Sequence, residues 1–227
     1  MKNLTQLLKE NSLVSEVDKC EHCGLRPKYK KRDWCERCIA QYRRRFKQTI
    51  KQKFKLITEQ VGEHYVEAEL HKLPNEIKHL LKDYEGLADL YLYGGVGTGK
   101  TYAMAALLKI FTFIGFNCIR INFDDFCVQV RGTFSPAAKQ TEQDIVRPLI
   151  DCDMLFVDDL ALRAKEESDF SYITLYTLIN KRQERMLPTI LSSNKSIEQL
   201  EQTFDSRIAS RLKLAKEIKF TGSDRRR

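Results

Sequence analysis

The sequence has 227 residues, 42% hydrophobic and 31% charged, which is enough to bury a full-sized core and excludes a wholly disordered chain. No apolar run approaches the roughly 18 residues of a membrane span, and the residues around Lys2, Lys9 and Glu10 do not form a signal peptide, so we expect a cytoplasmic protein. The net charge of +8 is concentrated in residues 1–60, which contain 16 basic and 7 acidic side chains. This asymmetry predicts two modules, residues 1–70 and 71–227.

Four cysteines near the N-terminus are spaced as two pairs, Cys20 with Cys23 and Cys35 with Cys38. Each pair presents two thiolates from one tight turn, and two such turns complete a tetrahedral Zn²⁺ site. The alternative is four free cysteines paired by accident. A closed four-sulfur site is structural, so we expect a zinc knuckle without catalysis.

An amphipathic helix is predicted to follow the knuckle, because apolar residues from Ile39 to Val61 recur every three or four positions. Lys and Arg side chains fill the rest of its surface. This basic face is either a solvated helix face or a surface for nucleic acid or an acidic partner protein, and the pattern does not choose between them. A linker from Glu63 to Gly86 follows, with Pro74 marking the start of a short helix over residues 75–82.

A phosphate-binding loop opens the second module. The strand-like run Ala88–Tyr93 leads into a glycine-rich loop and then into a helical run from Tyr102 to Phe111, the context that the G-x-x-x-x-G-K-[ST] motif requires. Lys100 is expected to reach the β- and γ-phosphates, and Thr101 to offer its hydroxyl to Mg²⁺. A chance glycine-rich turn is the alternative. The residues predicted to bind ATP or ADP are Gly94, Gly95, Val96, Gly97, Thr98, Gly99, Lys100, Thr101 and Tyr102.

Two aspartates, Asp158 and Asp159, end the apolar run that begins at Met154. Such a run is typical of a central parallel strand, and ligands bind at the carboxyl ends of these strands. We expect Asp158 to hold Mg²⁺ and Asp159 to orient the attacking water, the alternative being a helix N-cap.

The next predicted strand, Thr189–Ser193, ends at Asn194, which is either a ligand of the γ-phosphate or attacking water, or a turn residue. Further strands and helices alternate between residues 118 and 185. This alternation predicts an α/β fold with a parallel, doubly wound sheet.

These motifs, in this order over residues 88–227, resemble the AAA+ ATPases, and among them the DnaC-type helicase loaders, some encoded by phages, and the related IstB transposition ATPases. The resemblance implies an AAA+ domain without a C-terminal helical lid. It implies that Asn194 is sensor 1 and that Arg211 is an arginine finger acting on a neighbouring subunit, with Arg207 beside it. A solvated helix face is the alternative for these two arginines.

The segment from Gly222 to Arg226 resembles the family ending that includes sensor 2, which makes Arg226 the candidate. Asp224 and Arg225 depart from the usual residues there, and a frayed basic tail is the alternative. Similarly, Ser168 and Phe170 match a loader segment that contacts single-stranded DNA, although Phe170 also suits a helix-start core residue.

The resemblance therefore implies an ATPase that loads the hexameric replicative DNA helicase onto single-stranded DNA, using residues 1–70 to bind the helicase. ATP sites would form between subunits of an oligomer. Two alternatives are an IstB-like ATPase that assists a transposase, and a nucleotide-gated DNA-binding regulator, which predicts tight and salt-sensitive DNA binding by residues 1–70.

Replacing Cys20 and Cys23 with Ser is expected to unfold the knuckle and to leave ATP binding intact, because the two modules are predicted to fold independently. Bound zinc and ATP affinity, measured on the same preparation, check this. A loss of ATP binding together with zinc would contradict the independence of the modules.

Overall fold

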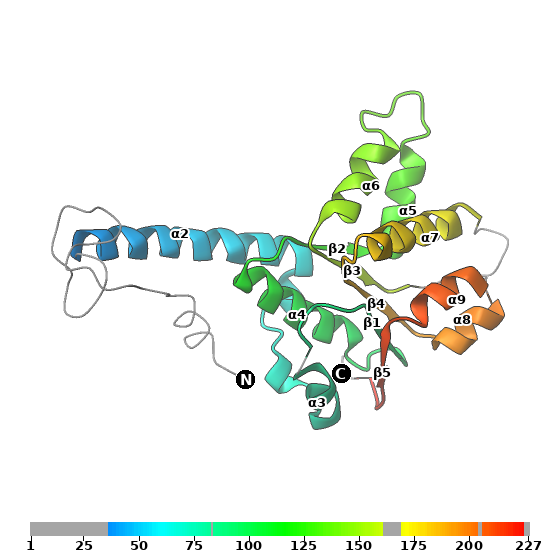
Figure 1. The fold of residues 1–227 in the computed structure, drawn as a ribbon, viewed down its shortest axis with the longest axis horizontal. Helices are drawn as coiled ribbons and strands as arrows, with labels where there is room; N and C mark the ends of the chain where they lie inside the picture. The colour runs from blue at the N-terminus through cyan, green and yellow to red at the C-terminus, as the bar shows by residue number, and fades with distance from the viewer. Residues whose placement is uncertain (1–35, 83, 161–168, 204–205, 225–227) are drawn as a thin grey trace. The chain divides into compact units, whose positions relative to one another are not determined.

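The computed structural model describes residues 36–82, 84–160, 169–203 and 206–224 (Figure 1). The chain divides into two compact units, residues 1–56 and 57–227. Helix α2 (Glu36–Val61) crosses this division, and its last turn, with Ile57 and Val61, packs in the core of the second unit. The division lies earlier in the chain than the boundary predicted near residue 70. No helix among the described residues is both long and apolar enough to cross a membrane.

A five-stranded, all-parallel sheet forms the centre of the second unit, with the strand order β2-β3-β4-β1-β5 (Figure 1). The predicted α/β class and parallel sheet are confirmed. The strands are β1 (Leu90–Gly94), β2 (Cys118–Asn122), β3 (Met154–Asp158), β4 (Thr189–Ser193) and β5 (Lys216–Phe220). Strands β3 and β4 are buried at every position, which explains the near-continuous apolar sequence of β3, whereas β4 also buries the hydroxyls of Thr189, Ser192 and Ser193.

Helices cover both faces of the sheet. Successive side chains of a strand point to opposite faces, so a buried strand needs an apolar layer on each side. Leu90 and Leu92 of β1 belong to one apolar cluster, and Tyr91 belongs to the other. The first cluster contains residues of α3 (Asn75–Lys82), α4 (Lys100–Ile114) and the end of α2. The second contains residues of α5 (Phe123–Gly132), α6 (Glu142–Asp151), α7 (Asp169–Glu184), α8 (Ile197–Thr203) and α9 (Ser206–Leu212).

The local sequence signals gave most of these elements. The helix expected over residues 75–82 and the strand expected over 189–193 have the observed bounds, and the helix predicted after the glycine loop extends to Ile114. Strand β5 was not predicted. At this edge of the sheet the charged Lys216, Glu217 and Lys219 are exposed and only Ile218 and Phe220 are buried, so β5 has no continuous apolar run.

A fully buried arginine, Arg182 of α7, joins three parts of the second unit. Its guanidinium donates to the carbonyls of Leu149 at 2.7 Å and Cys152 at 2.9 Å, at the end of α6. It also donates to the carbonyl of Pro188 at 2.7 Å and the hydroxyl of Thr189 at 3.0 Å, where β4 begins. Burial lowers the pKa of Arg182, so the hydrogen bonds to the negative end of the α6 dipole compensate a charge that lacks full hydration.

Replacing Arg182 with Met is expected to lower the free energy of unfolding by about 3 kcal/mol or more, because several buried carbonyls lose a charged donor. Arg185→Met is the matched control. The Arg185 side chain is 54% exposed and pairs with Asp151 at the surface, so its loss is expected to cost about 0–1 kcal/mol. Urea unfolding followed by circular dichroism measures both, and equal losses would contradict the role given to Arg182.

Candidate nucleotide-binding site

The glycine-rich loop joins the end of β1 to the start of α4 and leaves the first amides of α4 without a side-chain cap. Gly99, the N-cap, has φ +103° and makes no side-chain cap at this helix end. Such a helix end binds anions through its amides and its dipole. Gly97 has φ +73°, a backbone conformation that favours glycine, and a Cβ added there would also lie 1.9 Å from an oxygen of the exposed Asp224 side chain, which would have to move.

Lys100 lies at the bottom of this loop and is only 7% exposed. Its ammonium donates to the carbonyls of Gly94 and Gly95, each at 2.8 Å, and to Oδ1 of Asn194 at 2.9 Å. The structure therefore brings together Lys100 and Asn194, which are 94 residues apart in the sequence. The ammonium is held at the phosphate loop by groups that phosphate oxygens can replace.

Asp158 ends β3 and is 2% exposed. Its Oδ1 accepts from Oγ1 of Thr101 at 3.2 Å, from Oγ of Ser192 at 2.6 Å and from the backbone N–H of Asp159 at 3.1 Å. Its Oδ2 pairs with Nη2 of Arg120 at 2.5 Å. A hydroxyl and a carboxylate in contact are oxygen ligands of the kind that Mg²⁺ prefers, so Thr101 and Asp158 fit the predicted Mg²⁺ site.

Asp159 follows with an exposed side chain and a left-handed backbone, φ +54°. Its N–H donates to Oγ of Ser192 at 2.9 Å as well as to Asp158. A non-glycine residue in this conformation stores strain, and strain of this kind is common at functional sites. The backbone turn thus separates the two carboxylates, one buried in the site and one directed to solvent.

Sequence reasoning missed Ser192 and Arg120. Ser192 lies in β4, where a serine within a predicted central strand was the available signal. Arg120 interrupts β2 between Ile119 and Ile121, and a charged residue at that position was the corresponding signal. Neither signal identifies the residue that is contacted, because Asp158, the partner of both side chains, lies on another strand, β3.

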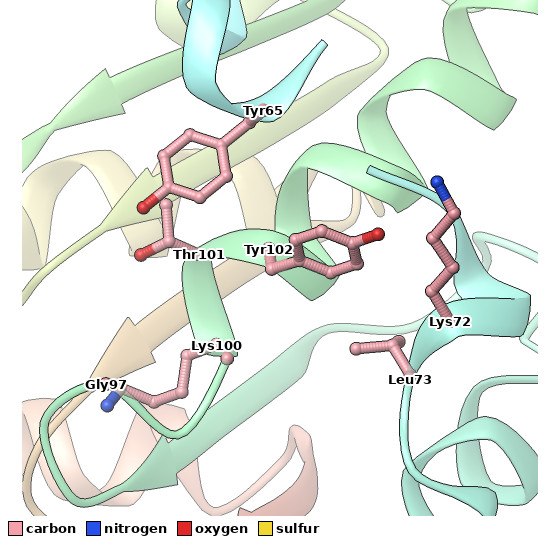
Figure 2. A pocket seen from close by; sticks show the side chains of 8 residues that line it. Tyr65, Lys72, Leu73, Gly97, Lys100, Thr101 and Tyr102 are labelled. Atoms are coloured by element: carbon pink, nitrogen blue, oxygen red, sulfur yellow. The ribbon is translucent and has the colours of Figure 1, made fainter. Parts of the chain in front are cut away.

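A pocket of about 340 Å³ opens beside the phosphate loop. Figure 2 shows the rings of Tyr65 and Tyr102 next to Lys100 and Thr101. The pocket combines two aromatic rings with an aliphatic side chain and two cationic side chains. Its lining residues are Tyr65, Lys72, Leu73, Gly97, Gly99, Lys100, Thr101 and Tyr102.

The chain segment before β1 that forms one wall of this pocket is hydrogen-bonded to α4. Lys109 donates to the carbonyls of Val66 and, at 2.9 Å, Ala68, and the hydroxyl of Tyr102 accepts from the N–H of Glu69 at 3.2 Å. Burial lowers the pKa of Lys109, because the charged ammonium loses part of its hydration at this wall. The segment before β1 is therefore part of the site, although the sequence assigned it only to a linker.

The two predicted finger arginines lie on α9, away from the contacts described for Lys100. The guanidinium of Arg207 lies 5.8 Å from the ring centre of Tyr176, and Arg211 is half-buried. Both line an open surface hollow with Ser210 and Lys213.

Several predicted residues lie outside the part of the chain that the structure describes. They are Cys20, Cys23, Cys35, Ser168 and Arg226, and for Cys38 and Phe170 only the helical backbone is described. Among the described residues, no group of three or more His, Cys, Asp or Glu side chains is placed to hold a metal ion. The zinc and DNA-contact assignments stay predictions.

Comparison with known proteins gives a family. The family described as the bacterial DnaA ATPase domain matches residues 78–219. A curated relative, the replicative helicase loader DnaC of Buchnera aphidicola subsp. Acyrthosiphon pisum, is 22% identical over 137 residues, which cover 60% of this chain and 55% of the relative. The chain therefore matches about half the length of this relative.

Solved structures share the fold. The crystal structure of the DnaC helicase loader has a TM-score of 0.59 at 17% identity, covering 70% of this chain and 100% of that one. The AMPPCP-bound DnaA of Aquifex aeolicus has a TM-score of 0.58 at 20% identity, covering 67% of this chain and 50% of that one. At these identities the similarity concerns the fold alone.

Proposed function

The chain belongs to the bacterial DnaA ATPase-domain family of AAA+ proteins, and from this premise we propose that it binds and hydrolyses ATP to load a replicative DNA helicase onto single-stranded DNA. The observation that supports the ATPase part is the convergence of four polar groups at the carboxyl ends of three strands. Lys100 and Thr101 follow β1, Asp158 ends β3, and Asn194 follows β4.

Each of these groups has a distinct role in the proposed reaction. Lys100, released from the carbonyls of the loop, neutralises the β- and γ-phosphates, and Asn194 stays within reach of the γ-phosphate or the attacking water. Thr101 and Asp158 supply oxygen ligands for Mg²⁺, which would neutralise charge on the phosphates when bound. Asp159, exposed on its strained turn, orients the water.

The pocket beside the loop suits the adenine base. Tyr65 and Tyr102 offer ring surfaces for stacking, and Leu73 adds an apolar contact. The contacts of Lys109 fix this wall before a ligand arrives, which reduces the ordering cost of binding. ATP or ADP is therefore the nucleotide we propose, with Tyr102 among its ligands.

Arg211, with Arg207 beside it, is proposed to act on the γ-phosphate bound to a neighbouring subunit. Both line an exposed hollow, so a second copy of the chain has access to them. A guanidinium meets the charge that spreads over the phosphoryl oxygens better than an ammonium does. This proposal requires self-association, with ATP sites between subunits.

The loader part of the proposal rests on the curated relative and on the N-terminal sequence. The relative is named a replicative helicase loader. The four paired cysteines, proposed to bind Zn²⁺, precede the basic helix α2, and we propose this segment as the helicase-binding module. Ser168 and Phe170 are the proposed contacts to single-stranded DNA, and Arg226 is the proposed sensor 2.

Three substitutions are expected to separate nucleotide binding from hydrolysis. Lys100→Ala removes the ammonium at the phosphates and is expected to weaken ATP affinity at least about 100-fold. Asp159→Asn is expected to keep ATP binding and to lower turnover about 10²–10³-fold, and Arg211→Ala about 10³-fold or more. Fluorescent-nucleotide binding and phosphate release measure the two steps. Full turnover in Arg211→Ala would rule out its assignment as the finger.

The loader function is tested by mixing the full chain with the cognate replicative helicase, ATP and single-stranded DNA, and weighing the complexes by native mass spectrometry. We expect a complex of loader and helicase, and Lys100→Ala serves as the control for nucleotide dependence. Failure to bind the helicase in the presence of ATP would overturn the loader proposal. Salt-sensitive binding to DNA alone would favour the regulator, and stimulation of a transposase the IstB-like alternative.

A further inference from the structure

Arg120 of β2 lies against the carboxylate that is proposed to hold Mg²⁺. Its Nη2 is 2.5 Å from Oδ2 of Asp158, and the two side chains are 18% and 4% exposed. In the sheet register Arg120 pairs with Phe156, and Asn122 pairs with Asp158, so the guanidinium reaches diagonally along the neighbouring strand to the carboxylate. The side chain of Arg120 therefore extends along β3 toward the proposed magnesium site to contact Asp158.

Gln60, in the last turn of α2, holds Arg120 in this position. Its side-chain Oε1 accepts from the N–H of Arg120 at 2.7 Å, and its Nε2 donates to the carbonyl of Cys118 at 2.7 Å. The main-chain carbonyl of Gln60 accepts from Nη1 of Arg120 at 3.0 Å. Because β2 is an edge strand, the amide of Gln60 pairs with its outer edge in the way a further strand would.

The guanidinium is not fully satisfied by these contacts. Nε of Arg120 is buried and has no hydrogen-bond partner among the described residues. A buried donor without a partner costs free energy, so the guanidinium is held in this position by an incomplete set of hydrogen bonds. The 18% exposure of the side chain leaves it a route to solvent.

The other oxygen of Asp158 is already occupied. Oδ1 accepts from Thr101, Ser192 and the N–H of Asp159, which leaves Oδ2 as the oxygen with which a cation gains most. A guanidinium at Oδ2 neutralises the carboxylate and also repels a divalent cation. Arg120 and Mg²⁺ therefore cannot both interact with Asp158 at full strength.

We propose that Arg120 competes with Mg²⁺ for Oδ2 of Asp158, and that Gln60 positions Arg120 for this competition. The inference rests on the proposed ATPase function, because Asp158 is taken as the magnesium residue. It makes the last turn of α2, the helix that continues into the proposed helicase-binding module, a part of the magnesium site.

The test measures the affinity of the full chain for fluorescent ADP as MgCl₂ is increased, together with its affinity in EDTA. Arg120→Gln is expected to lower the half-saturating Mg²⁺ concentration about tenfold or more relative to wild type. Arg147→Gln is the matched control, because Arg147 also pairs with an aspartate but is 82% exposed on α6. It is expected to leave the Mg²⁺ dependence unchanged.

Gln60→Ala tests the positioning role. It removes the side-chain contacts to β2 but keeps the main-chain carbonyl, so we expect a smaller shift of about two- to threefold in the same direction. An unchanged Mg²⁺ dependence in Gln60→Ala would overturn the role of Gln60. An unchanged or raised half-saturating concentration in Arg120→Gln would overturn the competition itself.

Thermal unfolding supplies a readout that does not depend on turnover. Without Mg²⁺, Arg120→Gln is expected to melt several degrees below wild type, because Asp158 loses its counter-ion, and Mg²⁺ with ADP is expected to stabilise this variant more than wild type. If Arg120→Gln does not fold, Arg120→Lys replaces it. A lysine cannot contact the carbonyl of Gln60 and the carboxylate of Asp158 at the same time, so we expect a decrease in the half-saturating Mg²⁺ concentration that is smaller than the one expected for Arg120→Gln. Absence of ADP binding by wild type in EDTA and in Mg²⁺ would overturn the proposed function, whereas normal binding with an unmoved Mg²⁺ midpoint would overturn this inference alone.

Discussion

The buried carboxylate of Asp158 is the constraint around which the site is organised. A carboxylate that is 2% exposed is stable in its charged form only if protein groups replace its hydration. Four elements supply these groups: α4 through Thr101, β2 through Arg120, β4 through Ser192, and the turn after β3 through the N–H of Asp159. Because the donors come from both neighbouring strands, the register of the sheet is also the geometry of the site.

The phosphate loop also holds a buried charge, the ammonium of Lys100, that is hydrogen-bonded by protein groups. The ammonium of Lys100 donates to two loop carbonyls and to Asn194, so groups of the chain itself compensate its burial. The amides at the start of α4 have no side-chain cap. The loop thus keeps its shape before binding, and a phosphate meets donors that are already placed, which lowers the ordering cost of recognition.

Contacts made by the segment before β1 connect the site to the rest of the chain. Lys109 and Tyr102 fasten residues 66–69 to α4, and Gln60 of α2 pairs with the edge of β2 and with Arg120. A segment that reads as a linker therefore forms the wall of the proposed base pocket, and Gln60 of α2 contacts Arg120, which pairs with the proposed magnesium residue. This gives the α2 helix a physical connection to the ATPase chemistry.

The sequence by itself determined the parallel α/β fold, the phosphate loop and the two aspartates, because these depend on contiguous patterns: an apolar strand, a glycine turn, a helix. It also placed Asn194 at the site, since the carboxyl ends of parallel strands lie at one edge. Only the tertiary structure decided that Arg120, Ser192, Tyr65 and Gln60 join them. Their partners lie about 30 to 60 residues away along the chain, or on another strand, and their contacts depend on strand register and helix docking, which no local pattern encodes.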